Sequence, residues 1–460
     1  MFSLVTDTPH IFMELCDVVR LFTDEYDPAP YEIEVSLKNP RAVIRINGAV
    51  FESDLLGEAS LPRRLFVRAA KNTLYRALRT HFDREVPWGS LTGIRPSKLV
   101  YEELLQGTAD FEGIADKLQR EFFVHADKAR LITEIVRNQQ GHIPREPDWV
   151  NLYIHIPFCP SRCYYCSFVS EVIDKQKGLV EPYVEKLCLE LVAARELLRQ
   201  SGRRVFSIYI GGGTPTVLST EQLARVLTAC AEPCAEFTCE AGRPDTITHE
   251  KIAVMKNFGV TRVSVNPQSL NDDTLKAIGR KHTEAEFYAA YGLASTAGFV
   301  INVDLIAGLV QETPDDFAAT LTKVSALRPQ NITVHTLSKK RGSQVKEQCM
   351  TEFSSNVSQM TAFAGRYLTD MGYIPYYLYR QKQMLDNLEN VGYCLPAYPC
   401  VNNITVMEEA LSVVACGAGA ISKLVIPQEN RIERLANIRD VKLYLERFDE
   451  QISKKQKFFT

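Results

Sequence analysis

Three cysteines lie within eight residues of one another, in the segment HIPFCPSRCYYCSF. They are Cys159, Cys163 and Cys166, so their spacing is C-x3-C-x2-C, which suits a loop around a soft metal centre. A structural zinc site takes four ligands, typically from two C-x2-C pairs, and the chain has no second such pair. A four-iron cluster held by three cysteines leaves one iron free to bind a small molecule. We therefore predict an iron–sulfur cluster here, in preference to zinc or to inert core thiols.

A glycine-rich segment, GGGTPT, occupies positions 211–216 directly after a short apolar run. Backbone without side chains can approach a bound cofactor closely. Taken alone, a glycine run more often forms a turn, but its position one predicted strand after the cysteines favours a cofactor loop. The remaining cysteines are expected to be packing residues. Among them, Cys394, Cys400 and Cys416 are the candidates for a second cluster, at a loose spacing that does not favour one.

From residue 148 onward, short apolar runs alternate with longer amphipathic segments. Strands joined by helices pair in parallel through right-handed crossovers, so this pattern predicts a wound sheet or barrel, and six such units predict a partial (β/α)6 barrel. Chemistry in such folds lies at the carboxyl ends of the strands, where the cysteines fall. The predicted strands cover residues 150–156, 205–210, 235–240, 260–265, 299–305 and 331–337.

The regions on either side of the predicted barrel have different patterns of apolar and polar residues. Residues 31–47 alternate apolar and polar side chains around a Lys-Asn-Pro turn, which predicts a hairpin, and 62–82 and 113–140 show helical spacing. Helical spacing is also present at 182–200, between the first two predicted strands, and at 356–371. The fold class is therefore α/β. We expect an N-terminal α+β domain (1–147), the barrel (148–340) and a C-terminal extension that closes the pocket (341–460).

Net charge and hydropathy limit the kinds of partner and the location that we expect for the protein. The 460 residues carry a formal net charge of -3, which argues against nucleic acid or an anionic membrane surface as a partner. No uncharged apolar run is long enough to span a bilayer and no secretory signal is present, so we expect a soluble cytoplasmic protein. The cluster Lys454, Lys455 and Lys457 is expected to be a solvated tail.

The cysteine loop and the glycine loop together resemble those of the radical S-adenosylmethionine (SAM) enzymes. That resemblance implies one [4Fe-4S] cluster and one or two SAM molecules, whose cleavage gives a radical that abstracts hydrogen from substrate. Glu240, Gln268, the segment GRKH at 279–282 and NVDLI at 302–306 follow in the order typical of the oxygen-independent coproporphyrinogen III oxidase group. By this resemblance Tyr153, Gly212 and Glu240 serve the cluster-bound SAM. The matching positions for a second SAM are Tyr165, Gly213, Thr214, Gln268, Arg280 and Asp304, with Ser338 aligned less securely.

Within that group, WGSLTGIRPSKL at 88–99, the segment 391–423 and the long N-terminal region resemble the HemZ-type branch. The implied reaction is the oxidative decarboxylation of two propionates of coproporphyrinogen III to vinyl groups, giving protoporphyrinogen IX. The implied partners are this tetrapyrrole and a cytosolic electron donor such as flavodoxin or ferredoxin. A tetraanionic substrate also calls for basic side chains, for which Arg95, Arg280 and Lys339 to Arg341 are candidates.

One departure keeps two alternatives open. The best-studied oxidases carry a further cysteine two residues after the third cluster cysteine, where this chain has Phe168. Haem chaperones share this C-x-F ending, so haem binding and transfer without decarboxylation is one alternative. Radical SAM methyltransferases and cyclopropane-forming enzymes, which use the same pocket, are the other. The long N-terminal region favours the HemZ-type branch over both.

Overall fold

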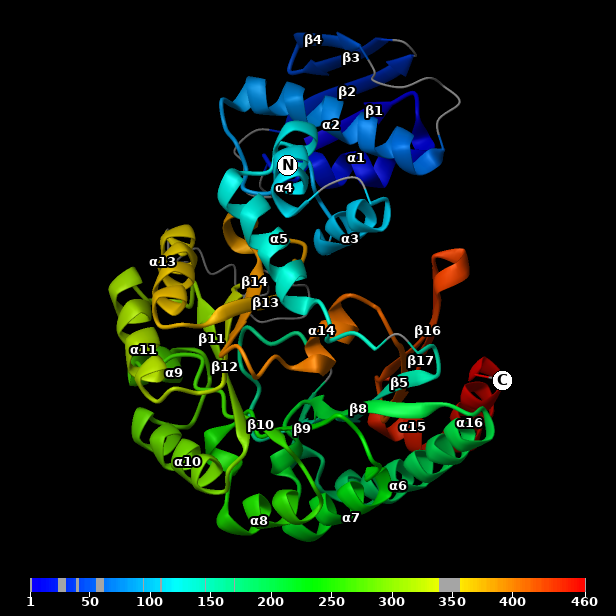
Figure 1. Ribbon diagram of the computed structural model, residues 1–460, viewed down its shortest axis with the longest axis vertical. Coiled ribbons are helices and arrows are strands. Elements are labelled where there is room, and N and C mark those ends of the chain that lie inside the picture. Colours follow the sequence, from blue (N-terminus) through cyan, green and yellow to red (C-terminus); the bar gives the residue numbers. More distant parts are fainter. Residues whose placement is uncertain are drawn as a thin grey trace. The chain divides into compact units, whose positions relative to one another are not determined.

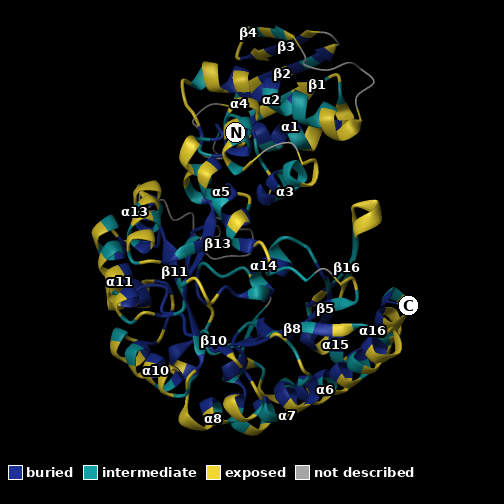
Figure 2. Ribbon diagram, in the orientation of Figure 1, coloured by how far each residue is buried: buried dark blue, intermediate teal, exposed yellow. Residues whose placement is uncertain are grey.

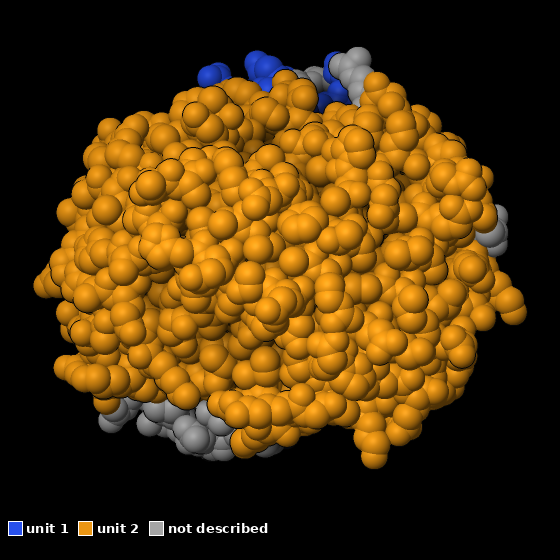
Figure 3. All heavy atoms as spheres, turned by 90° about the horizontal axis from the view of Figure 1, so that it is seen from below, with its two compact units in different colours: residues 1–134, 386–388 blue, residues 135–385, 389–460 orange. Residues whose placement is uncertain are grey.

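The computed structural model describes residues 2–23, 30–38, 41–54, 62–93, 95–107, 110–144, 146–168, 170–338 and 356–459. The chain divides into two compact units (Figure 3). Unit 1 comprises Met1–Glu134 with Asp386–Leu388, and unit 2 comprises Ile135–Leu385 with Glu389–Thr460. The domain limits expected at residues 147 and 340 stay predictions.

Unit 1 is an α+β unit built on a four-stranded sheet, in which β1 (Phe2–Thr6) pairs in parallel with β2 (Tyr31–Lys38). The expected hairpin is present as β2 and β3 (Arg41–Ile46), and β4 (Ala49–Asp54) extends it. Its apolar side chains and those of two helices form one buried core. The helices that begin in this region are α1 (Phe12–Val19), α2 (Arg63–Phe82), α3 (Ser97–Leu105), α4 (Phe111–Phe122) and α5 (Ala126–Gln139). The spacing at 113–140 thus forms two helices, because Phe123 adopts a left-handed conformation (φ 60°) that ends α4.

Unit 2 contains an eleven-stranded sheet in the order β13-β14-β12-β11-β10-β9-β8-β5-β15-β16-β17. Its six central strands are parallel neighbours, which confirms the partial (β/α)6 barrel. Buried residues occur on both faces of these strands, as expected for a sheet that is covered on each side (Figure 2). The six are β5 (Trp149–Ile156), β8 (Arg204–Gly212), β9 (Glu236–Glu240), β10 (Arg262–Ser264), β11 (Val300–Ala307) and β12 (Asn331–Thr336).

Amphipathic helices connect the barrel strands and follow one another around the outside of the sheet (Figure 1). Three of them begin with a capping box, at Ser219, Thr283 and Thr313, which satisfies the free backbone N–H groups of the first turn. Each helix buries one face and exposes the other. They are α6 (Lys177–Gln200), α7 (Thr220–Cys230), α8 (His249–Asn257), α9 (Asp272–Ala277), α10 (Glu284–Thr296) and α11 (Pro314–Ala326).

The C-terminal extension adds strands to both edges of the barrel sheet. At one edge β14 (Asn390–Cys394) pairs antiparallel with β12 and with β13 (Ile374–Tyr379). At the other edge β15 (Ser412–Cys416) pairs in parallel with β5, followed by β16 (Ile421–Ile426) and β17 (Arg431–Ala436). Its helices are α13 (Val357–Asp370), α14 (Val401–Met407), α15 (Val441–Glu446) and α16 (Phe448–Phe459). Among the described helices, none combines the length and the apolar character needed to cross a membrane.

Candidate active site

The cysteine loop begins where β5 ends and is held in place by neighbouring backbone. Cys159 lies in the two-residue strand β6 (Phe158–Cys159), which pairs with β7 (Glu171–Val172). Farther along the loop, the N–H of Tyr164 donates to the carbonyl of Ile278 at 3.2 Å. Cys163 is buried, while Cys159 and Cys166 are half-buried. Backbone hydrogen bonds therefore fix the path of the loop at Cys159 and at Tyr164.

The glycine loop at the end of β8 packs directly against the cysteine loop. The N–H of Gly213 donates to the carbonyl of Ile156 at 2.7 Å, and the N–H of Thr214 donates to the carbonyl of Phe158 at 2.8 Å. A Cβ added at Gly213 would lie 2.4 Å from that Phe158 oxygen. At Gly212, where φ is +104°, it would lie 2.7 Å from the His155 ring. Glycine is required here because the two loops approach closely, a reason that the sequence pattern did not reveal.

The two loops open onto a cavity of about 360 Å³ at the carboxyl ends of the barrel strands. All residues expected to bind the cluster or SAM line it, except Tyr153. The Tyr153 hydroxyl instead shares a hydrogen bond with Nδ1 of His155 at 3.2 Å, and its ring stacks on Tyr209 with 6.2 Å between centroids. The lining residues from the expected set are Cys159, Cys163, Tyr165, Cys166, Gly212, Gly213, Thr214, Glu240, Gln268, Arg280, Asp304 and Ser338.

Two carboxylates in the cavity have pKa values that differ in opposite directions from the ordinary value. Burial raises the pKa of Glu240 to about 7, although the Tyr209 hydroxyl donates to Oε1. Burial acts to raise the pKa of Asp304 as well, but the interaction with His335 and hydrogen bonds from Asn302 and Thr333 outweigh it and hold that pKa below its usual value. Donors to the Asp304 carboxylate include the side-chain amides of Asn266 at 2.9 Å and Asn302 at 2.8 Å. At neutral pH the cavity thus holds one fixed negative charge and one carboxyl poised to titrate.

Several buried polar atoms in this cavity have no hydrogen-bond partner. They are Oε1 of Gln268, Oδ1 of Asn302 and Nε of Arg280. Gln268 also adopts a left-handed backbone conformation (φ 70°), which is unfavourable for a side chain of this type. The other guanidinium nitrogens of Arg280 are engaged, with Nη1 donating to the carbonyl of Asn266 at 2.8 Å and Nη2 to the Tyr165 hydroxyl at 3.1 Å. Unpaired polar atoms that are costly to bury indicate the place of a polar ligand such as SAM.

The cysteines fit a cluster better than a single ion. Among the described residues, no three His, Cys, Asp or Glu side chains converge on one metal ion. In a four-iron cluster each cysteine binds a different iron, so the cysteine sulfurs need not converge on one point. Burial raises the pKa of Cys159, and raises that of Cys166 to about 11, so both thiols remain protonated at neutral pH until a metal binds.

The candidates for a second cluster lie apart from one another. Cys416 lies at the end of β15, in register with Ile154 near the end of β5. Cys394 is in register with Asn331 at the start of β12. Cys400 donates to Glu236, at the start of β9, with a sulfur–oxygen distance of 3.0 Å. Cys416 is therefore at the opposite end of the barrel strands from the other two, and these three cysteines do not form one site.

Other cavity residues were not identified from the sequence. Several lie two positions before a predicted residue on the same strand or loop, as Asn266 does before Gln268 and Asn302 before Asp304, so the two-residue period of strands is a usable signal. Arg243 had no such signal. Of the predicted basic residues, Arg280 lines the cavity, Arg95 belongs to unit 1 and stays a prediction, and 339–341 lie outside the described residues. Further lining residues are Tyr209, Tyr377, Tyr379, Asn403 and Met407.

Comparison with known proteins agrees with this geometry. The Radical SAM superfamily model matches residues 153–324. The chain is 36% identical over 472 residues to the oxygen-independent coproporphyrinogen-III oxidase-like protein HemZ of Bacillus subtilis (strain 168), covering 98% of this chain and 93% of HemZ. It is 38% identical over 192 residues to the haem chaperone HemW of Lactococcus lactis, covering 40% of this chain and 48% of HemW.

A solved structure shows the same fold. Coproporphyrinogen III oxidase HemN from Escherichia coli, described as a radical SAM enzyme, superposes with a TM-score of 0.54 at 24% identity, covering 68% of this chain and 72% of HemN. The cysteine loop, the glycine loop and the cavity thus belong to a fold that uses a [4Fe-4S] cluster and SAM. The chain belongs to the radical SAM superfamily and, within it, to the HemZ-type branch of the oxygen-independent coproporphyrinogen III oxidase group.

Proposed function

We propose that the protein is an oxygen-independent coproporphyrinogen III dehydrogenase that converts two propionates into vinyl groups and yields protoporphyrinogen IX. The observation that carries this proposal is the extent of the similarity to HemZ, which covers 93% of that protein, including the N-terminal region. The similarity to haem chaperones is less extensive, covering 40% of this chain for HemW of Lactococcus lactis and 66% for HemW of Haemophilus influenzae. The regions outside the barrel therefore favour the HemZ-type reaction.

When bound, the reduced cluster and SAM supply a carbon-centred radical that abstracts a hydrogen atom. Loss of that atom from the β-carbon of a propionate, followed by loss of CO2 and of one electron, converts CH2–CH2–COO⁻ into CH=CH2. One hydrogen atom is therefore removed for each vinyl group formed. An electron donor of the flavodoxin or ferredoxin class would reduce the cluster, and the electron released from the substrate needs an acceptor.

The protein's own residues would bind and orient the reactants. Cys159, Cys163 and Cys166 would hold the cluster, and the cavity carboxylates Glu240 and Asp304 would accept hydrogen bonds from amino or hydroxyl groups of SAM. Asp304 is itself held by His335, whose Nε2 lies 3.6 Å from the carboxylate.

Aromatic rings form part of the cavity lining. The rings of Tyr377 and Tyr379 are stacked, with an angle of 11° and 6.3 Å between centroids. Such faces suit an adenine or pyrrole ring, since aromatic side chains bury a large apolar area.

Haem binding and transfer is a second candidate, and one residue favours it. Phe168 follows Cys166 and Ser167 in the C-x-F ending shared with haem chaperones, and its side chain lines the cavity while remaining 67% exposed. An exposed aromatic ring of this size at the mouth of a cavity suits contact with a macrocycle. The two candidates differ in whether bonds of the tetrapyrrole change.

An anaerobic product assay separates the two. Protein reconstituted with iron and sulfide is incubated with reductant, SAM and coproporphyrinogen III, and the products are identified by mass spectrometry. We expect protoporphyrinogen IX and one 5′-deoxyadenosine for each vinyl group. Cleavage of SAM without any vinyl product would contradict the proposal. In that case, a haem titration that shows stable binding and transfer to an acceptor protein would establish the chaperone function.

A further inference from the structure

Arg243 is a buried cation beside the cluster loop. It follows Glu240 by three residues, after the end of β9, and it is 3% exposed. Its side chain lines the cavity together with Ser161 and Cys163 of the cysteine loop. Burying a charged side chain this deeply costs free energy unless each of its N–H groups donates a hydrogen bond. The hydrogen-bond partners of Arg243 therefore indicate its role.

Every nitrogen of the guanidinium group has a partner. Nε and Nη2 donate to the two carboxylate oxygens of Asp245 at 3.0 and 3.1 Å, which forms a bidentate pair. Nη1 and Nη2 both donate to Oγ of Ser161 at 3.1 Å, and the Ser161 hydroxyl in turn donates to the carbonyl of Gly279 at 3.0 Å. The guanidinium is therefore held rigidly from two sides.

Nη1 of this side chain has two further acceptors, the backbone carbonyl of Ser161 at 3.4 Å and a cysteine of the cluster loop. Nη1 of Arg243 donates to Sγ of Cys163 with a nitrogen–sulfur distance of 3.7 Å. Arg280, the other arginine of the cavity, directs its Nη1 and Nη2 to backbone carbonyls and to Tyr165. Among the described residues, Arg243 is thus the arginine that donates a hydrogen bond to a cysteine of the cluster loop, and it places a positive charge beside that sulfur.

Hydrogen bonds to cluster sulfurs and nearby charges set the reduction potential of an iron–sulfur cluster. Reduction adds one negative charge to the cluster. A fixed cation and a donor at one of its sulfurs stabilise the reduced form more than the oxidised form, since Coulomb interaction grows with charge. Water screens this interaction only weakly, because Arg243 and Cys163 are both buried.

From these contacts we infer that Arg243 tunes the cluster, raising its reduction potential by donating a hydrogen bond to the Cys163 sulfur, while Asp245 holds the guanidinium in place and partly offsets its charge. Arg243 is a positioning and tuning residue in this account. The inference rests on the cluster itself and not on the identity of the tetrapyrrole, so it can fail or succeed independently of the proposed reaction.

The test is a redox titration of the reconstituted full-length protein, monitored by electron paramagnetic resonance, without tetrapyrrole and without SAM. Arg243→Gln removes the charge and is expected to make reduction about tenfold less favourable, a shift of about 59 mV for a one-electron couple. Asp245→Asn removes the counter-charge and is expected to shift the potential in the opposite direction. Arg243→Lys keeps the charge but loses the planar set of N–H donors. Its reduction potential should therefore lie between those of the wild type and Arg243→Gln.

Arg195→Gln is the matched control, since Arg195 pairs with Glu232 outside the cavity, and it should leave the potential unchanged. Opposite shifts for Arg243→Gln and Asp245→Asn support the inference. Unchanged potentials, or shifts in the same direction, overturn it, because a purely structural role would loosen the site in both variants. If Arg243→Gln holds no cluster, Asp245→Asn alone decides, with an upward shift in favour and no shift or a downward shift against.

Discussion

Two groups of buried polar side chains in unit 2 differ in how completely they are paired. One is the Glu190 cluster, formed by Glu190, Asn437, Tyr444 and Lys455, beside strand β15, which lies between β5 and β16. Each carboxylate oxygen of Glu190 has two donors, including Asn437 Nδ2 at 2.8 Å and the Tyr444 hydroxyl at 2.5 Å. The Lys455 ammonium donates to Glu190, to the carbonyl of Ala415 at 2.5 Å and to the Cys416 sulfur at 3.7 Å.

The other group is the set of cavity residues Gln268, Arg280 and Asn302, each of which leaves one buried polar atom unpaired. Both groups have been taken out of water, which costs more for a charged side chain than for a neutral amide unless each polar atom is paired. The Glu190 cluster recovers that cost within the protein, so its role is to fix the C-terminal extension against the barrel. The cavity does not, so its polar atoms are arranged for something that binds there. Burial alone would not distinguish the two, whereas pairing does.

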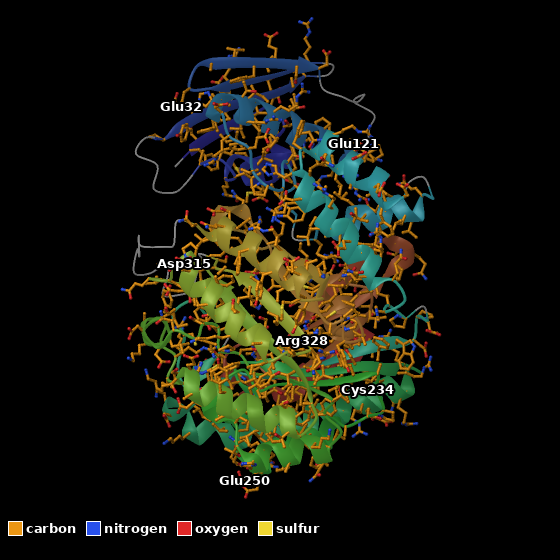
Figure 4. All side chains as sticks on the ribbon, turned by 60° about the vertical axis from the view of Figure 1, so that its left-hand side comes forward. Glu32, Glu121, Cys234, Glu250, Asp315 and Arg328 are labelled. Atoms are coloured by element: carbon orange, nitrogen blue, oxygen red, sulfur yellow. The ribbon has the colours of Figure 1, made fainter. Side chains whose placement is uncertain are left out.

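The largest expected effect comes from a substitution that removes cluster binding in the cavity and leaves the Glu190 cluster intact. Cys163→Ser removes a proposed cluster ligand, so iron content and SAM cleavage should fall to the level of protein without iron, with little change in the free energy of unfolding. Iron analysis and 5′-deoxyadenosine measurement check this. Cys234→Ser is the matched control, because Cys234 is a half-buried cysteine outside the cavity (Figure 4). Equal loss in both variants would contradict the assignment of the cluster.

The next largest effect is expected from a substitution that removes the ion pair of the Glu190 cluster and leaves the cavity lining unchanged. Lys455→Met leaves Glu190 buried without its counter-ion, which should lower the free energy of unfolding by about 3–5 kcal/mol. Lys454→Met is the control, since Lys454 pairs with Glu450 at the surface and such pairs contribute about 0–1 kcal/mol. Urea denaturation followed by circular dichroism measures both. Similar losses for the two lysines would show that the Glu190 cluster is not structural.

A smaller expected effect is a dependence of SAM affinity on pH, which tests the role of Glu240 in the cavity. With the pKa of Glu240 at about 7, ionisation of this carboxyl should strengthen binding of a cationic ligand such as SAM as pH rises. Between pH 6 and pH 8 we expect affinity for SAM to increase about tenfold, in step with the ionised fraction. Glu240→Gln should be nearly flat over that range in a calorimetric titration. An equally steep dependence in the variant would assign the titration to another group.

Much of the barrel is predictable from the sequence, because each strand is short, apolar and followed by an amphipathic helix. The hairpin and the helix at 357–370 also follow from local periodicity. The strands β13 to β17, which extend the barrel sheet at its two edges, were not predicted. β14 and β15 pair with β12 and β5, which lie far away along the chain, whereas β16 and β17 form a local hairpin that was not identified. In the site, the residues at strand ends were predictable, whereas the position of Tyr153 involves stacking against Tyr209 of the neighbouring strand β8.

One sequence expectation is wrong for a reason that helical spacing explains. Lys455 was expected in a solvated lysine cluster, yet it is 2% exposed, whereas Lys454 and Lys457 are exposed. Gln451, Lys455 and Phe459 recur every four residues and share the buried face of α16. Adjacent lysines therefore have opposite environments, which composition could not reveal but helical phase could.

Binding of SAM to the cavity tests the central claim most directly. The claim is that the unpaired buried atoms of the cavity exist for a ligand, and calorimetric titration of SAM into the anaerobically reconstituted protein measures it. We expect saturable binding that Gln268→Ala weakens about tenfold, the cost of one lost hydrogen bond to a buried polar group. Gln200→Ala, on the exposed end of α6, should bind as the wild type does. No binding, or equal affinity in all three proteins, would contradict the account.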